Sequence, residues 1–365
     1  MSQIIKANQT LNNKFHILKA PSTVGRPKSI SLNTEPTFTL WQDSYLSLHF
    51  GDSLDYYTTW ETPTVIVSDG GYGILGFEGD TSDHFNLPQW YEPHIEQWTK
   101  YSVPQTTLWF WNSEIGWASV HPILEKYGWH YVNCNIWNKG KGHIAGNVNT
   151  QKIRRFPVVT EVCVQYVLKA RINEIPLKEW LLSEWKRTGL PLKKANEACG
   201  VKDVATRKYF DQGHLWYFPP PEMFEKMSNY ANQYGNPDGR PYFSRDKKTP
   251  MTKEEWKAMR SKFYCPHGIT NVWERNALRG KERITINSSK AVHLNQKPLD
   301  LTLQIIEASS DVDDVVWEPF GGLFTASIAA RKLRRKAFAA EIDWTYFYYG
   351  VQRAKAEYHL PAFLE

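Results

Sequence analysis

Short apolar runs that end at turn residues alternate with helical patterns along residues 41–170. Leu46–Phe50 alternates apolar and polar side chains, Thr64–Val67 is a β-branched run, and both stop at Gly, Ser or Asp. Such runs predict strands, and strands that alternate with helices predict an α/β sheet. The same patterns predict further strands over Thr106–Trp111, Tyr131–Trp137 and Pro157–Val167, and helices over Pro88–Tyr101 and His121–Tyr127.

The pattern changes at about Arg171. Residues 171–287 are densely charged, and their helical patterns are broken by Pro and Gly, as in Phe218–Pro221. We therefore expect a mainly helical second unit in this stretch. Beyond it the pattern returns to strand, helix and strand, which predicts a βαβ unit. Its elements are expected over Asp314–Trp317, Thr325–Ala330 and Ala337–Ala340.

The composition is that of an ordinary globular protein, with 41% apolar and 22% charged residues among 365. No run approaches about eighteen uninterrupted apolar residues, and the N-terminal residues are polar, so we expect neither a membrane span nor a secretion signal. The four cysteines lack the spacing of a zinc site or a disulfide framework. These features predict a cytoplasmic protein without a metal site. A net charge of +6 indicates a surface that mildly attracts polyanions.

A cofactor site is predicted where the strand at Asp314–Trp317 ends. Glu318–Gly322 (EPFGG) follows it, and glycines at such a turn let a ligand approach the backbone closely. Glu341 ends the next strand, at the offset of about twenty residues where dinucleotide-type folds place an acid against ribose hydroxyls. A carboxylate at the turn repels a pyrophosphate and attracts a cation, so a sulfonium nucleoside fits better than NAD. A tight turn without a ligand is the alternative.

Several segments together resemble the amino-methyltransferases of DNA. Glu318–Gly322 is similar to the family's Asp/Glu-Pro-Phe-x-Gly cofactor motif, and His293–Leu299 (HLNQKPL) to its His-Pro-x-x-Lys-Pro segment. Asp69–Tyr72 (DGGY) resembles the catalytic Asp-Pro-Pro-Tyr tetrapeptide, with glycine at both proline positions. Leu48–Ser53 resembles the Gly-Asp segment that precedes the catalytic strand. On its own, the tetrapeptide is also typical of a plain turn.

The resemblance implies that the chain binds S-adenosylmethionine and methylates an exocyclic amine of a base in double-stranded DNA. Asp69 and the Gly70 carbonyl would accept hydrogen bonds from the amine, and Tyr72 would stack on a base flipped out of the duplex. The catalytic residues implied are Asp69, Gly70, Gly71 and Tyr72. The cofactor-binding residues implied are Glu318, Pro319, Phe320, Gly321, Gly322, Glu341, Asp52, Ser68, Asn295 and Lys297.

The preferred target is adenine N6 because the tetrapeptide starts with Asp, whereas the family's cytosine-N4 enzymes more often have Ser there. Counting Ser68 as that first residue would leave Asp69 misplaced, and cytosine N4 is therefore the alternative. Proline fixes φ, so Gly70 and Gly71 must lose more backbone entropy to reach the same shape. This departure motivates a third hypothesis, a helix-turn-helix DNA-binding protein whose methyltransferase-like fold is inactive.

The catalytic motif precedes the cofactor motif, which is the circularly permuted order of the family's beta group. The resemblance therefore predicts an α/β fold, a Rossmann-like methyltransferase sheet with helices on both faces, built from residues 41–170 and 288–365. Residues 171–287 would form an inserted, mainly helical target-recognition domain. Residues 1–40 would be an N-terminal arm.

A helix-turn-helix is predicted within the middle segment, where Leu190–Val201 and Lys202–Phe210 have the required spacing around Gly200. Ala205 and Tyr209 would lie on the apolar face of the second helix. A helical hairpin without DNA contact is the alternative. The DNA-binding residues expected are Lys193, Lys194, Lys202, Thr206, Arg207 and Lys208, with the loop residues Arg154 and Arg155.

Two protein partners remain open beside DNA. One is a cognate restriction endonuclease that acts on the same site in a restriction-modification system, and the other is a second copy of the chain in a homodimer. No membrane partner is expected.

Overall fold

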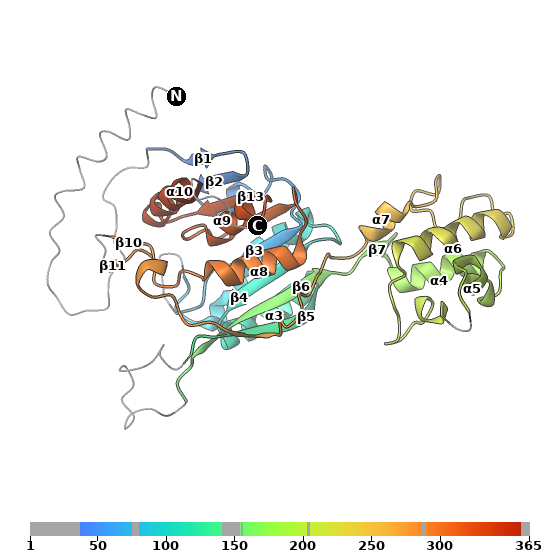
Figure 1. The fold of residues 1–365 in the computed structure, drawn as a ribbon, viewed down its shortest axis with the longest axis horizontal. Helices are drawn as coiled ribbons and strands as arrows, with labels where there is room; N and C mark the ends of the chain where they lie inside the picture. Colours follow the sequence, from blue (N-terminus) through green and yellow to red (C-terminus); the bar gives the residue numbers. More distant parts are fainter. Residues whose placement is uncertain are drawn as a thin grey trace. The chain divides into compact units, whose positions relative to one another are not determined.

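The computed structural model describes residues 37–74, 80–140, 154, 156–202, 205–286 and 290–358. Most of the arm expected over residues 1–40 lies outside the described residues, and so does Arg155. The described chain consists of a large sheet with its helices and of a helical segment that has a core of its own (Figure 1).

One nine-stranded sheet contains most of the strands (Figure 1). Its strand order is β1-β2-β13-β12-β3-β4-β6-β5-β9. The strands from β2 to β4 in this order run parallel, and β6 is antiparallel to both of its neighbours. The strands are β1 (Leu40–Gln42), β2 (Leu46–Phe50), β13 (Lys336–Glu341), β12 (Val315–Glu318), β3 (Val65–Ser68), β4 (Thr107–Asn112), β6 (Thr160–Leu168), β5 (Trp129–Asn138) and β9 (Val272–Glu274).

Segments from the first and last parts of the chain pair in this sheet. β12 lies parallel to β3, with Val316 opposite Val65. β13 lies parallel to β2, with Ala339 opposite Leu48. Strands that are far apart in the sequence therefore form one Rossmann-like α/β sheet, and the predicted fold class is confirmed.

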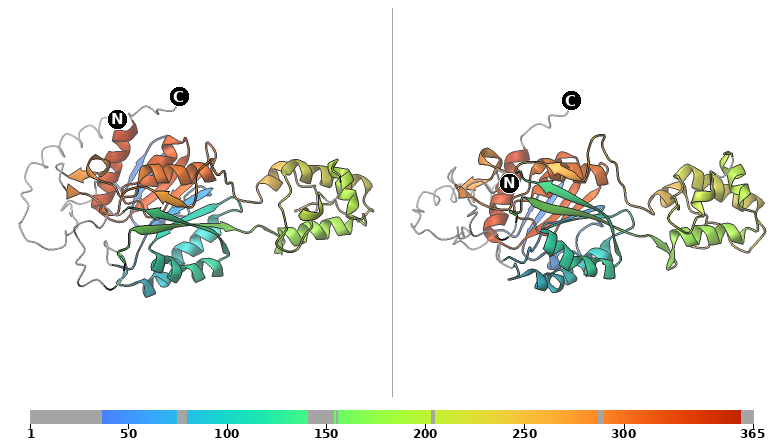
Figure 2. Two further views of the ribbon diagram at one scale, coloured as in Figure 1. Left: turned by 60° about the horizontal axis from the view of Figure 1, so that its bottom comes forward. Right: turned by 90° about the horizontal axis from the view of Figure 1, so that it is seen from below.

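Helices cover both faces of the sheet (Figure 2). Successive residues of a strand point to opposite faces, so the apolar run of β3 contributes to two cores. Val65 and Val67 pack in one core with side chains of α8, α9 and α10, while Ile66 packs in the other with side chains of α2 and α3. These helices are α2 (Leu87–Tyr101), α3 (Glu114–Lys126), α8 (Leu299–Ser309), α9 (Thr325–Lys332) and α10 (Trp344–Tyr358). Within the described chain, no helix is long and apolar enough to cross a membrane.

The helical segment has a separate buried core, made by residues between Ala170 and Met259. Trp256 is fully buried there and stacks on Phe224 and Phe218, with ring centroids at 4.3 and 4.6 Å. Stacked aromatic rings bury much apolar area in this small unit. The segment contains α4 (Leu177–Arg187), α5 (Lys193–Cys199), α6 (Pro221–Tyr234), α7 (Lys253–Lys257) and the hairpin of β7 (Arg171–Ile172) and β8 (Ile175–Pro176).

Short strands occur in the stretch that the sequence predicted to be helical. β9 pairs with the end of β5 in the main sheet, and β10 (Thr285–Ile286) pairs with β11 (Lys290–Ala291). Strands of two or three residues are too short to leave a period-two pattern, so the sequence did not reveal them. The described 3-10 helices are Ser53–Asp55, His84–Asn86, Arg207–Tyr209 and Gly280–Glu282.

The described residues of 202–210 do not form the second α-helix of the predicted helix-turn-helix. α5 ends at Gly200, which adopts the left-handed conformation with φ 67°. The described residues beyond it form a turn and the 3-10 helix Arg207–Tyr209. Thr206 is buried, and its amide and hydroxyl both donate to Asn196 Oδ1, while Ala205 is exposed. The hydrogen bonds from Thr206 to Asn196 of α5 therefore hold this segment in a turn.

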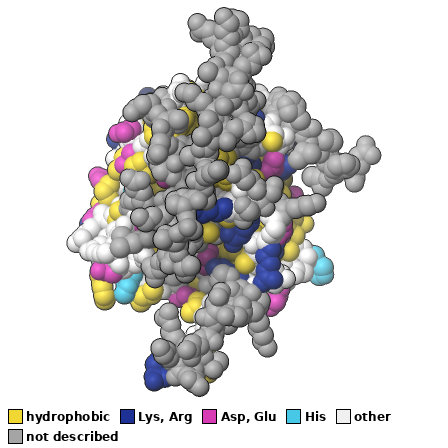
Figure 3. All heavy atoms as spheres, turned by 90° about the vertical axis from the view of Figure 1, so that its left-hand side faces the viewer, with side chains coloured by type: hydrophobic (Ala, Val, Ile, Leu, Met, Phe, Trp, Pro, Cys, Tyr) yellow, Lys and Arg dark blue, Asp and Glu magenta, His cyan; other side chains and the backbone are white. Residues whose placement is uncertain are grey.

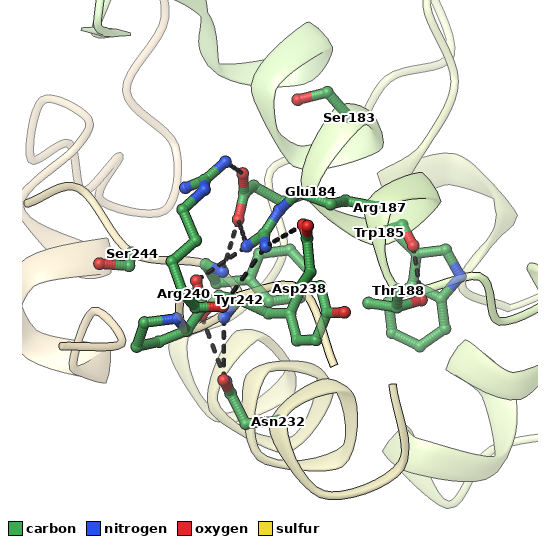
Figure 4. A network of polar contacts seen from close by, with 12 residues as sticks. Ser183, Glu184, Trp185, Arg187, Thr188, Asn232, Asp238, Arg240, Tyr242 and Ser244 are labelled. Atoms are coloured by element: carbon green, nitrogen blue, oxygen red, sulfur yellow. Dashed lines mark hydrogen bonds and ion pairs between the residues drawn. The ribbon is translucent and has the colours of Figure 1, made fainter. Parts of the chain in front are cut away.

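A buried carboxylate ties α4 to the loop that follows α6 (Figure 4). Glu184 is 3% exposed and accepts hydrogen bonds from Arg187 Nη2 and Arg240 Nη2, both at 2.8 Å. It also accepts one from the Phe243 amide at 2.9 Å, and Arg187 donates a further bond to Asp238 at 2.6 Å. Removal of the Glu184 charge would leave two arginines without this partner.

We expect Glu184→Gln to lower the free energy of unfolding by about 3 kcal/mol or more, because two arginines lose their buried anionic partner. Glu179→Gln is the matched control, since Glu179 is exposed on the same helix, and it should cost less than about 1 kcal/mol. Urea unfolding of the full chain, followed by tryptophan fluorescence, measures both. Equal midpoints for the two variants would contradict the structural role of Glu184.

Candidate active site

A cavity opens at the carboxyl ends of β3, β12 and β13. Parallel sheets bind ligands at this edge, beside the point where the strand order reverses. The loop after β3 and the turn after β12 line the cavity together. The predicted site residues that line it are Asp52, Asp69, Gly70, Tyr72, Asn295, Lys297, Glu318, Pro319, Phe320, Gly321, Gly322 and Glu341.

Two predicted site residues are not among those that line the cavity, Ser68 and Gly71. Ser68 is fully buried within β3, and this position gives no support to the cofactor contact predicted for it. The Gly71 carbonyl accepts hydrogen bonds from the Tyr91 hydroxyl at 3.0 Å and from the Asn112 side-chain amide at 2.9 Å. The Gly71 carbonyl is therefore held by side chains of α2 and β4.

The turn after β12 is fixed by the acid that begins it. Glu318 accepts hydrogen bonds from the Ala326 amide at 2.8 Å and from the amide and hydroxyl of Ser327 at 2.7 and 2.6 Å. These donors lie in the first turn of α9, where unpaired amides favour a negative charge. A Cβ on Gly321 would overlap the ring of Phe324, so only glycine fits there. Glu318 thus holds the turn, although the sequence predicted that it contacts the ligand.

A second buried acid lies beside the same turn. Glu341 ends β13 and accepts hydrogen bonds from the Gly322 amide at 2.5 Å and the Asp343 amide at 2.8 Å. Burial raises the pKa of Glu341 to about 8 and that of Glu318 to about 7. Both acids are therefore partly protonated near neutral pH.

Aromatic side chains from α2 form another wall. Phe320 lies 5.1 Å from Trp90 and 4.9 Å from His94, measured between ring centroids, and both line the cavity. The Tyr57 hydroxyl lies 3.0 Å from His94 Nδ1. Burial lowers the pKa of His94 to about 4, so the ring is neutral at pH 7. Asp52 completes this side, where it accepts a hydrogen bond from the Leu54 amide at 2.9 Å.

A cluster of buried charges surrounds the predicted catalytic acid. Asp69 Oδ1 accepts hydrogen bonds from Lys297 Nζ at 2.6 Å and from the Tyr72 hydroxyl at 3.0 Å. Lys297 is 6% exposed and also lies 3.4 Å from Glu161 Oε2, and Glu161 forms an ion pair with Lys139. The sequence assigned Lys297 to the cofactor, and in the structure its ammonium group contacts the predicted catalytic acid, Asp69.

Burial and neighbouring charges shift the pKa values of this cluster in opposite directions. Burial raises the pKa of Asp69, and Lys297 opposes that shift. Burial alone would raise the pKa of Glu161 as well, but Lys297 and Lys139 outweigh it and the pKa is lowered. The two carboxylates hold the pKa of Lys297 above its ordinary value in spite of its burial. Lys297 therefore remains an ammonium group at physiological pH.

Sequence reasoning missed Glu161, His94 and Asp80. Glu161 stands near the start of the apolar strand β6, and a lone acid in a buried strand was the signal that could have marked it. His94 lies one helical turn after Trp90 on α2, a spacing that puts both on one face. Asp80 follows a glycine-rich stretch of the sequence and offers no distinctive pattern.

The predicted DNA-binding residues differ in their accessibility. Thr206 is buried and bonded to Asn196, so its position does not offer it to DNA. Lys194 is half-buried and pairs with Glu197 at 2.6 Å. Lys208 lies 4.2 Å from the centroid of the Tyr217 ring, which is 48% exposed. The exposed members of the set are Arg154, Lys193, Lys202, Arg207 and Lys208, and Arg155 lies outside the described residues.

Known proteins resemble this chain in sequence and structure. A family model described as DNA methylase (N6_N4_Mtase) matches residues 34–352. The type II methyltransferase M1.MboII of Moraxella bovis is 32% identical over 127 residues, which are 34% of this chain and 48% of that protein. The DNA adenine methyltransferase YhdJ of Escherichia coli (strain K12) is 39% identical over 70 residues, 19% of this chain and 24% of that protein. The chain thus matches about half of the length of these relatives, or less.

Among solved structures, the PvuII DNA methyltransferase (cytosine-N4-specific) is 13% identical, with a TM-score of 0.47 over 88% of this chain and 89% of that one. The family match carries more weight because it spans most of the sequence and includes both segments that line the cavity. The chain therefore belongs to the DNA methylase family.

Proposed function

We propose that the protein is an S-adenosylmethionine-dependent DNA methyltransferase that acts on an exocyclic amine. The observation that carries this proposal is that one cavity is lined by both Asp69 and the turn Glu318–Gly322. An acceptor for the amine and a site for the methyl donor are thereby next to each other, as an in-line transfer requires. Membership of the DNA methylase family supports the same reaction.

The residues that line the cavity suit S-adenosylmethionine. Carboxylates and aromatic side chains lie together there, and a nucleoside with a cationic amino-acid tail can use both. Glu341 would accept hydrogen bonds from the ribose hydroxyls, Asp52 from the adenine amino group, and Phe320 would pack against the ligand. When bound, the cofactor supplies an electrophilic methyl group.

The loop after β3 would prepare the substrate amine. Asp69 would accept a hydrogen bond through Oδ2, because Oδ1 already accepts from Lys297 and Tyr72. The Gly70 carbonyl would be the second acceptor. Two acceptors favour a pyramidal nitrogen, whose lone pair is then free for attack. The Tyr72 ring would stack on the extruded base, a contact worth about 1–3 kcal/mol.

Adenine N6 is the target we propose, because the loop begins with Asp69. The likeness to an adenine methyltransferase of Escherichia coli supports it. Cytosine N4 is the second candidate, and an inactive DNA-binding protein is the third. Transfer of tritium from labelled cofactor to duplex DNA, followed by nucleoside analysis, separates them. Labelled N6-methyladenine would support the first candidate, and labelled N4-methylcytosine the second. DNA binding without any transfer of label would support the third.

The surface charge supports DNA as the substrate. Lys and Arg side chains gather near the middle of the face drawn in Figure 3, and the chain carries a net charge of +6. The likeness to a type II methyltransferase supports a role in a restriction-modification system, with a cognate endonuclease as partner. We expect the protein to act in the cytoplasm, where it meets DNA. A homodimer stays a prediction.

We expect Asp69→Ala to lower methyl transfer by about 100-fold or more, because the amine loses a preorganised acceptor. Cofactor binding should stay close to that of the wild type, since Asp69 faces the substrate. Glu96→Ala is the control, because Glu96 is an exposed acid on α2. Single-turnover transfer and equilibrium dialysis measure the two properties. Wild-type turnover in Asp69→Ala would remove Asp69 from the mechanism.

The buried acids predict a pH dependence. The pKa values of about 8 for Glu341 and about 7 for Glu318 lie above about 4.3, the ordinary value in an unfolded chain. Between about pH 4 and pH 8, the folded protein therefore binds more protons at these two acids than the unfolded chain does. Their contribution to stability is thus full below about pH 4 and is lost as the pH rises through 7 and 8.

Cofactor binding at pH 7 should release protons, because ribose hydroxyls and a sulfonium favour the ionised form of Glu341. Calorimetry in two buffers of different ionisation enthalpy measures this release, and we expect a fraction of one proton up to about one. The release should fall in Glu341→Gln and persist in Glu96→Gln. Equal heats in both buffers for the wild type would refute the linkage.

We expect the double replacement of Arg207 and Lys208 by Ala to weaken DNA binding and to flatten its salt dependence. Each lost phosphate contact reduces the slope of log K against log salt by about 0.9. Replacing Lys100 and Lys336, which lie on the sheet unit, is the matched control. Fluorescence anisotropy of labelled duplex DNA at several salt concentrations measures the slopes. An unchanged slope would exclude phosphate contacts at Arg207 and Lys208.

A further inference from the structure

The loop after β3 has glycine at both positions where the family's tetrapeptide has proline. A Cβ on Gly70 would lie 2.7 Å from two carbons of the Phe320 ring and 2.9 Å from the Tyr91 hydroxyl. Phe320 has little room to retreat, because the rings of Trp90 and His94 lie 5.1 and 4.9 Å from it. The aromatic wall therefore requires glycine at position 70, and proline cannot stiffen the loop there.

A buried carboxylate outside the tetrapeptide holds the loop instead. Asp80 Oδ1 accepts hydrogen bonds from the amides of Tyr72 at 3.0 Å and Gly73 at 2.9 Å, and Oδ2 accepts from the Ile74 amide at 3.1 Å. Asp80 is 7% exposed, so water competes little for these acceptors. One side chain thus fixes three successive amides shortly after Asp69.

A second set of contacts holds the carbonyl of Gly71. It accepts from the Tyr91 hydroxyl at 3.0 Å and from Asn112 Nδ2 at 2.9 Å. A carbonyl oxygen has two lone pairs, and both are used, so a substrate amine cannot bind here as well. The Gly70 carbonyl is then the backbone acceptor next to Asp69.

We propose that Asp80 is a positioning residue of this loop, and that its bonds to Tyr72–Ile74 replace the stiffness of the missing prolines. The proposal rests on the proposed function, because it concerns how Asp69 and the Gly70 carbonyl meet the amine. Acceptors that are held in place before reaction need no reorganisation during it. Asp80 acts on the amine through the loop.

Asp246 provides a matched control for this contact. Its carboxylate accepts hydrogen bonds from the amides of Lys248 at 2.8 Å and Thr249 at 2.9 Å, in a turn of the helical segment. It therefore stabilises a turn by the same chemistry, but it does not line the cavity and is not among the predicted DNA-binding residues. A purely local role of Asp80 should resemble that of Asp246.

The test compares single-turnover methyl transfer in four proteins. We expect Asp80→Ala to transfer about 100-fold more slowly, with the dissociation constant of S-adenosylmethionine changed less than about twofold. Asp246→Ala should transfer at the wild-type rate. Adding Gly71→Pro to Asp80→Ala should restore about tenfold, because proline fixes φ. A Cβ at Gly71 lies 3.0 Å from Asp80 Oδ1, so the alanine also gives the proline room.

Amide hydrogen exchange provides a readout that does not need activity. The Tyr72 and Gly73 amides should exchange faster in Asp80→Ala and stay unchanged in Asp246→Ala. If Asp80→Ala does not fold, Asp80→Asn takes its place, because it keeps one acceptor oxygen and should show smaller effects of the same sign.

The proposal is overturned if Asp80→Ala transfers at the wild-type rate. It is also overturned if the Tyr72 and Gly73 amides keep their protection, or if Gly71→Pro restores nothing. If the wild type transfers no methyl group to DNA, the proposed function fails, and the exchange data alone still decide whether Asp80 holds the loop.

Discussion

The parallel pairing of β12 with β3 is the constraint on which the site depends. Val316 lies opposite Val65, so the two strands end side by side and their loops meet over one cavity. Neither loop contains the whole site, because Glu318 ends one strand and Asp69 follows the other. The same pairing places Trp317 opposite Ile66, one residue further along both strands. The sheet, and not the loops, therefore determines how far apart the two acids lie.

At that cavity, four charged groups that are buried or half-buried balance one another. Lys297 lies 2.6 Å from Asp69 and 3.4 Å from Glu161, and Lys139 pairs with Glu161 from the other side. Burying such groups costs free energy, and the loss of one partner would leave the others uncompensated. Glu161 is therefore linked to Asp69 through Lys297, which lies within ion-pair distance of both carboxylates.

The sequence predicted what depends on local pattern and missed what depends on contacts between distant elements. Thr64–Val67 was predicted as a strand because β-branched residues cluster there, and β3 forms at that place. The acid-tipped turn after β12 was predicted from its glycines. Glu161 was missed because its partners, Lys139 and Lys297, lie on other segments. Asp80 was missed because it binds backbone amides, which leave no pattern of residue types. The prediction of a second helix at 202–210 was wrong. Thr206 donates a hydrogen bond to Asn196, a contact that helix propensity does not include.

The helical segment and the cavity of the sheet differ in whether a substitution in one place affects another. The buried residues of the helical segment, with Trp256 among them, belong to a cluster that shares no member with the two clusters of the sheet. Substitutions on its surface, at Lys208 for example, should therefore be energetically independent of the cavity. The cavity itself allows no such independence. Phe320 packs where a Cβ on Gly70 would lie, so the turn after β12 and the loop after β3 can change only together. Glycine at position 70 leaves room for Phe320, and the Asp80 carboxylate holds the loop that follows it.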